Sequence, residues 1–174
     1  MAITRLGGAN AISGTIPQGN IANASLGAIT ALPAAIPTGK ILQVSNLVET
    51  SSGQTIGSSS YVDLTGVTVN ITPTATSSKI LIMANLAGRL AADRGYGMQF
   101  VRGSTSVYAT TQAYSIYAQS AGEMYTFAHF EYIDSPSSTS ELTYKVQIRT
   151  NSGTSMTWNN ATNSNIFLME IAGW

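Results

Sequence analysis

From Lys40 onward, apolar and polar residues alternate along the chain with a period of two. The clearest example runs from Lys79 to Leu90, where Ile80, Ile82, Ala84, Leu86 and Leu90 share one parity and Lys79, Asn85 and Arg89 fall on the other. The stretch from Glu141 to Arg149 alternates in the same way. Because successive side chains of a β-strand point to opposite faces of a sheet, this period predicts strands that bury one face in a core.

Further strands are predicted where short alternating runs end at turn signals. The run from Glu123 to Ile133 is aromatic on both parities, and we expect such a strand to be covered on both faces. Ala91 to Gly97 is expected to be a loop, and Ser155 to Trp158 an edge strand. The other expected strands are Ile41 to Val48, Tyr61 to Leu64, Val67 to Ile71, Met98 to Arg102, Ser106 to Ala109 and Ile166 to Ile171. About eight to ten short strands without a convincing helix predict an all-β fold, an antiparallel β-sandwich or jelly-roll-like head.

The chain before Lys40 has a different pattern. Its apolar residues recur every three to five positions, a spacing too irregular for a strand, and Pro17, Pro33 and Pro37 interrupt any helix. Such a segment must bury its apolar side chains against other chains. We therefore divide the chain into an extended arm for attachment or oligomerisation, residues 1–39, and a head domain, residues 40–174. The arm residues expected to make these contacts are Ile12, Ile16, Ile21, Leu26, Ile29, Leu32 and Ile36.

Charge is scarce in this 174-residue chain. Charged residues make up 9% of it and the formal net charge is zero, against roughly 25% charged residues in an ordinary soluble domain. A neutral surface argues against nucleic acid as a partner and suits a protein that works inside an assembly. The chain has no cysteine, no long apolar signal segment and no run of about eighteen apolar residues. We therefore expect no membrane insertion and synthesis in a cytoplasm.

Catalytic chemistry has little support in the sequence. The single histidine, His129, lies in an aromatic strand without a GxSxG motif, and is expected to pack in a core or a subunit interface. One histidine and scattered carboxylates predict neither a metal site nor an enzyme. Gly95-Tyr96-Gly97 reads as a loop and not as a phosphate cradle, so no cofactor is expected. A glycosidase would need two carboxylates across a cleft, and the candidates are Asp93, Glu123, Glu131, Asp134 and Glu141.

Binding is better supported than catalysis. Several aromatic residues stand among Ser, Thr, Asn, Gln and Gly in sequence that reads as loops, and rigid rings beside short polar groups suit the recognition of sugars or protein surfaces. The alternative is that these rings cap the core or fill an oligomer interface. The stretch YATTQAYSIY is the most suggestive, because it is aromatic without a strand parity. The candidate ligand-contact residues are Tyr96, Tyr108, Tyr114, Tyr117 and Trp158.

The arm and head together resemble a known class of proteins. The arm sequence GTIPQGNIANASLGAITALPAAIPTG resembles the low-complexity neck segments of bacteriophage tail fibres and related virion appendages. The head contains, in order, ITPTATS, SSKILIMANLAG, FVRGSTSVY, LTYKVQIRTNSG and FLMEIAGW. This order is similar to small β modules in fibre and head proteins of phages from aquatic bacteria.

This resemblance implies a homotrimeric, non-enzymatic virion protein assembled in the host cytoplasm. Its partners would be its own copies, capsid or tail proteins, and a host surface glycan. Two forms remain open: a fibre whose head projects and contacts the host, and a capsid decoration protein whose arm joins neighbouring capsid subunits. A carbohydrate-active enzyme using Asp93, Glu131 or Asp134 is the third alternative.

Overall fold

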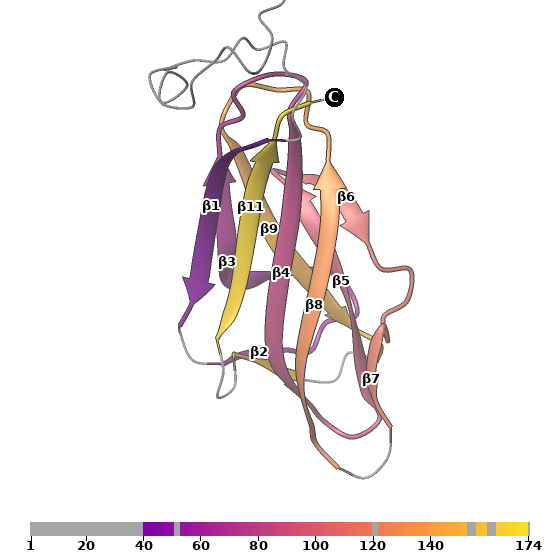
Figure 1. The fold of residues 1–174 in the computed structure, drawn as a ribbon. Helices are drawn as coiled ribbons and strands as arrows, with labels where there is room; N and C mark the ends of the chain where they lie inside the picture. The colour runs from indigo at the N-terminus through magenta and orange to yellow at the C-terminus, as the bar shows by residue number, and fades with distance from the viewer. Residues whose placement is uncertain (1–39, 51–52, 120–121, 153–155, 160–162, 174) are drawn as a thin grey trace, which may run out of the picture. The chain divides into compact units, whose positions relative to one another are not determined.

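The computed structural model describes residues 40–50, 53–119, 122–152, 156–159 and 163–173. The arm expected over residues 1–39, with its seven apolar contact positions, lies outside the described residues. Within them the chain forms eleven strands in two antiparallel sheets and no helix (Figure 1). This confirms the predicted all-β fold. The described part also contains no helix long and apolar enough to cross a membrane.

The first sheet is built around β4, the longest strand. Its order is β1–β11–β4, with β8 on the other edge of β4; β10 follows β11 along the same edge of β4 and pairs with β2. Figure 1 shows β1, β11, β4 and β8 side by side. The bounds of these strands are β1 Ile41–Glu49, β2 Gln54–Ile56, β4 Lys79–Leu90, β8 Met124–Asp134, β10 Met156–Trp158 and β11 Ser164–Ile171.

The second sheet has the order β3–β9–β5–β6, and β7 also pairs with β5. Its strands are β3 Val62–Ile71, β5 Arg94–Arg102, β6 Thr105–Ala109, β7 Ile116–Ala118 and β9 Leu142–Thr150. The eight longer strands in chain order are β1, β3, β4, β5, β6, β8, β9 and β11. If these eight strands are renumbered 1 to 8 in chain order, the first sheet (β1, β11, β4, β8) has the order 1-8-3-6. The second sheet (β3, β9, β5, β6) has the order 2-7-4-5. This is the paired Greek-key arrangement of a jelly roll.

The core lies between the two sheets and follows the predicted alternation. On β4 the even-numbered positions from Ile80 to Leu90 are buried, and on β9 the buried positions are Tyr144, Val146, Ile148 and Thr150. Trp158 and Tyr96 add the largest rings, which meet edge to face with centroids 4.7 Å apart. Alternating apolar residues on both sheets thus close one continuous core.

Two sequence predictions about individual strands were wrong, and a third stays a prediction. The expected loop from Ala91 to Gly97 ends early, because Asp93 turns the chain at φ 54° and β5 starts at Arg94. The segment ending at Trp158 is not an edge strand, since β10 pairs with both β4 and β2. The expected cover on both faces of β8 does not come from the described residues, since Tyr125 and Phe127 are 64% and 59% exposed, and cover by another chain stays a prediction.

One buried carboxylate joins the loop after β3 to the first sheet. Glu170 has no exposed surface. It accepts hydrogen bonds of 2.6 Å from Ser78 Oγ and Gln43 Nε2, and of 2.7 Å from the Thr74 backbone N–H and Oγ1. Burial alone would raise the pKa of Glu170, but the bonds from Ser78, Gln43 and Thr74 outweigh it and lower the pKa below its usual 4.5. The folded state therefore stabilises the ionised carboxylate.

We predict that Glu170→Gln destabilises the head by about 1–3 kcal/mol near neutral pH, because the amide cannot accept all of these bonds. Glu170 has a lower pKa in the folded than in the unfolded chain, so its contribution is present above the unfolded value and is lost as pH falls through the folded value. Denaturant titrations should therefore show the two proteins converging in acid. The exposed Glu141→Gln is the control and should change stability little at either pH.

Candidate functional site

Two of the predicted ligand-contact residues lie together on the surface. Tyr114 and Tyr117 are 54% and 43% exposed, and their rings meet edge to face with centroids 6.5 Å apart. Together with Asn151 they line a hollow of about 370 Å³. We call this the tyrosine hollow. It combines two rigid apolar rings with one amide, in a volume at the lower end of small-molecule sites.

The tyrosine hollow is positioned by glycines in β5. The backbone N–H of Gly95 donates to Asn151 Oδ1 at 3.0 Å, and the Asn151 N–H donates to the Gly95 carbonyl at 3.2 Å. A Cβ at Gly95 would lie 2.7 Å from Tyr114 Cβ, and one at Gly97 would lie 2.5 Å from the Gln112 carbonyl oxygen. The two glycines therefore let the segment before β7 lie directly on β5. The Gly-Tyr-Gly motif has this packing role.

Tyr96 and Trp158, two of the candidate ligand-contact residues, instead match the alternative that such rings pack in the core. Both have no exposed surface. Tyr96 lies between the two glycines and points into the core, where burial raises its pKa above the usual value. Trp158 pairs with Gly88 in the register of β10 and β4, and its ring packs 3.2 Å from where a Cβ of Gly88 would lie. Neither ring is available to a ligand on the surface.

Tyr108 is neither fully buried nor part of the tyrosine hollow. It is half-buried and stacks on Tyr132 of β8, with centroids 5.3 Å apart and planes 28° from parallel. It also lies 6.1 Å from the ring of Phe100. Tyr108 thus joins the edges of the two sheets, and the structure does not bring it to the tyrosine hollow.

Two of the candidate carboxylates, Asp134 and Glu123, are held by neighbouring side chains. Asp134 is buried and accepts hydrogen bonds from Arg102 Nη1 at 2.5 Å and from the Tyr144 hydroxyl at 2.7 Å, which links β8 to the second sheet. Burial, and then the bond to Asp134, raise the pKa of Tyr144. Glu123 forms an ion pair with Arg89 at 2.8 Å. These contacts give Asp134 a structural role and Glu123 a surface one.

His129 and Glu131 are neighbours on the outer side of β8. His129 is exposed, so it does not pack in the core of the head. Its Nδ1 lies 2.9 Å from Asn85 Oδ1 and its Nε2 lies 3.6 Å from Glu131. Across the described ranges, no three His, Asp or Glu side chains gather as metal ligands. An interface role for His129 stays a prediction.

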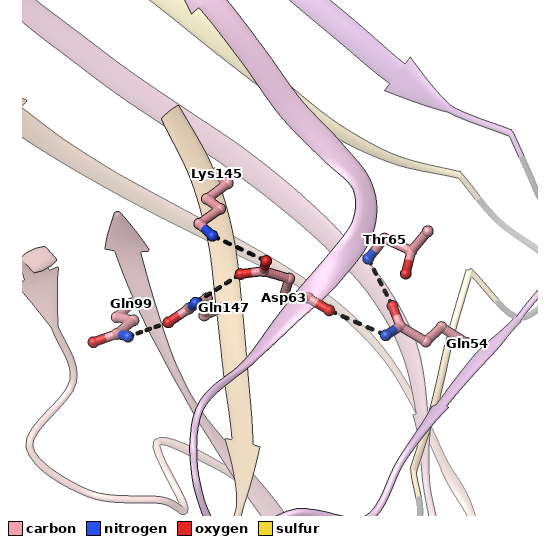
Figure 2. A network of polar contacts seen from close by, with 6 residues as sticks. All are labelled: Gln54, Asp63, Thr65, Gln99, Lys145 and Gln147. Atoms are coloured by element: carbon pink, nitrogen blue, oxygen red, sulfur yellow. Dashed lines mark hydrogen bonds and ion pairs between the residues drawn. The ribbon is translucent and has the colours of Figure 1, made fainter. Parts of the chain in front are cut away.

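A polar network covers the outer face of the second sheet (Figure 2). Asp63 accepts hydrogen bonds from Gln147 Nε2 at 2.6 Å and Lys145 Nζ at 2.9 Å, which lower its pKa. Gln99 Nε2 donates to Gln147 Oε1. Gln54 donates to the Asp63 carbonyl at 3.0 Å and thereby connects β2 to β3. The donors and acceptors in this network satisfy one another, as expected of a solvated sheet face.

Comparisons with known proteins give fold likeness alone. No protein-family model and no curated protein sequence matches the chain. Similar solved structures include the infectious bursal disease virus VP2 subviral particle, with TM-score 0.48, 15% identity, and coverage of 74% of this chain and 32% of that one. A structure of the Gx strain of that virus has TM-score 0.45, 14% identity, and coverage of 74% and 32%. The chain therefore spans about one third of these chains.

We predict that Gly95→Ala destabilises the head by about 1–3 kcal/mol, because the added Cβ overlaps the Tyr114 side chain and the Ile116 carbonyl. Thermal unfolding measures the loss. Gly122→Ala is the matched control, since a Cβ there meets nothing within 4 Å. Equal stability of the two variants would contradict the close packing of the tyrosine hollow on β5.

Proposed function

We propose that this protein is a non-enzymatic structural component of a bacteriophage virion. In this proposal it is a homotrimeric, fibre-like protein whose arm, residues 1–39, attaches to the particle and whose jelly-roll head projects from it. The nearly chargeless, apolar arm supports the proposal, because such a segment needs other chains around it. The resemblance of the arm and head sequences to virion appendages supports it further.

The tyrosine hollow is the observation that best supports a head that projects from the particle and contacts the host. Two exposed rings held at a fixed angle beside Asn151 form a preorganised surface for the apolar face of a sugar ring. Amide groups such as that of asparagine hydrogen-bond sugar hydroxyls. We therefore propose a host surface glycan as the ligand of the head.

Capsid decoration is the second candidate. It is favoured by the apolar side chains on the outer side of the first sheet, among them Val44 and Ile133, which are 53% and 47% exposed. A face of this kind suits a head that lies against a capsid lattice. Counting copies per particle separates the two functions: a decoration protein is present in many copies, and a fibre in few.

We predict that changing Ile16, Ile21 and Leu26 together to Asp abolishes incorporation into particles while the head stays folded. The reason is that three carboxylates cannot be buried in an apolar contact. Immunoblotting of purified particles measures incorporation. The control changes Gln18, Asn20 and Asn23 to Asp, which adds the same charge at polar positions. Normal incorporation of the first variant would contradict attachment through the arm.

We predict that Tyr114→Ala and Tyr117→Ala each weaken binding to host cells or their purified surface glycans by about tenfold, because each removes a stacking surface. Tyr114→Phe and Tyr117→Phe keep the rings and should retain most of the binding. Titration of trimeric protein on immobilised glycan measures both sets. Binding that is unaffected by loss of both rings would exclude the tyrosine hollow as the receptor site.

A further inference from the structure

The outer face of the first sheet carries an apolar row that crosses four strands. In the strand register Val44 of β1 lies opposite Met169, Met169 opposite Leu81, and Leu81 opposite Ile133 of β8. Residues paired in this way point to the same side of a sheet and touch their neighbours. The row therefore forms an unbroken apolar band across β1, β11, β4 and β8, which lie side by side in Figure 1.

More apolar side chains extend the band along the strands. Phe167 and Met83 are opposite each other in the next outer row. Beyond them a polar row of Asn165, Asn85 and His129 crosses the face. After that row, Phe127 and Tyr125 of β8 are among the most exposed hydrophobic side chains in the described part of the chain. The face is also hollowed: Leu81, Glu131, Tyr132 and Ile133 line a depression of about 410 Å³. Such a depression can receive a side chain from a partner.

Charges on this face are few and balanced. Lys79 and Arg89 are matched in number by Glu123 and Glu131, so their formal charges sum to zero. Arg89 is paired with Glu123 at 2.8 Å, and Glu131 lies 3.6 Å from His129. A neutral face can pack against the same face of other copies around a common axis without like-charge repulsion, whereas a strongly charged partner would gain nothing here. This balance favours a second copy of the chain.

The second sheet has the opposite outer surface. Outward positions on β9 are Thr143, Lys145, Gln147 and Arg149, and Asp63 of β3 joins the hydrogen-bonded network of Figure 2. One side of the sandwich is therefore suited to water and the other to protein. This contrast shows that the apolar band is not a general property of the low-charge sequence.

The apolar side is large enough to hold copies together. Four strands about 4.8 Å apart and a β4 strand of 12 residues give a face of roughly 20 by 35 Å, about 700 Å² in projection. Stable protein–protein interfaces bury about 800 Å² on each partner. The face therefore provides nearly the area that one stable contact between copies needs.

We propose that copies of this chain associate through the outer face of the β1–β11–β4–β8 sheet. The proposal deepens the proposed function and rests on its oligomeric state, but it assigns the contact between copies to the head. The β9 side then remains in solvent.

The test uses the full chain. Sedimentation of the wild type should show an oligomer, and Leu81→Lys with Met83→Lys should weaken association by roughly a hundredfold or more. The control, Thr143→Lys with Gln147→Lys, adds the same charge to the outer face of the second sheet and should leave association unchanged. Circular dichroism confirms that each variant is folded.

A second measurement needs no substitution. Met83 and Met169 on the face are partly exposed, whereas Met98 and Met156 are buried in the core. Peroxide oxidation of the wild type, followed by mass spectrometry, should convert Met83 and Met169 to sulfoxide much faster at protein concentrations where the oligomer dissociates. Oxidation of both at the same rate at every concentration would overturn the proposal.

The outcomes distinguish this proposal from the proposed function. If the face variant stays oligomeric while the Ile16, Ile21 and Leu26 variant becomes monomeric, the arm holds the copies together and the face proposal is wrong, although the virion role stands. If the wild type is a monomer and Met83 is nevertheless protected from oxidation, another part of the same chain covers the face, which also overturns the proposal. If the wild type is a monomer and is also absent from purified particles, both the face proposal and the proposed virion function are wrong.

Discussion

Strand β4 hydrogen-bonds to β8 along one edge and to β11 and then β10 along the other, so its register sets the position of every side chain in the first sheet. Its inner side supplies Ile80, Ile82 and Leu86 to the core, and its outer side presents Leu81 and Met83. A one-residue slip would exchange the two sides. Part of the outer side, with Leu81 and Met83, is apolar as well, so β4 contributes both to the core and to an apolar surface.

Polar side chains fix the two sheets around this strand. Asp134 at the end of β8 receives bonds from Arg102 and Tyr144 of the second sheet, and Glu170 of β11 holds the loop that contains Thr74. Both carboxylates are buried, so each is stable only because several donors meet it. The carboxylates that sequence reasoning considered for catalysis include one of these structural groups.

The strands that could be predicted were those in which apolar and polar residues alternate with a period of two. Alternation on β4 and β9 identified both strands and their buried sides without any tertiary information.

The burial of Trp158 could not be predicted, because it depends on pairing with Gly88, which lies far away in sequence. The irregular aromatic pattern around Tyr114 and Tyr117 did indicate a special segment. The contribution of Asn151 to the tyrosine hollow arises only from strand pairing and was not predictable. On β8, aromatic residues on both parities correctly indicated an apolar outer side, which the single chain leaves exposed.

We propose that an apolar sheet face and an apolar arm make this chain a component of an assembly. Cryo-electron microscopy of the particle that contains the chain, at a resolution where strands are visible, would locate the heads. We expect symmetry-related heads whose β1–β11–β4–β8 sheets contact one another, with their β9 sides in solvent. Separate heads with the β4 sheet facing solvent, or particles without density for this chain, would contradict it.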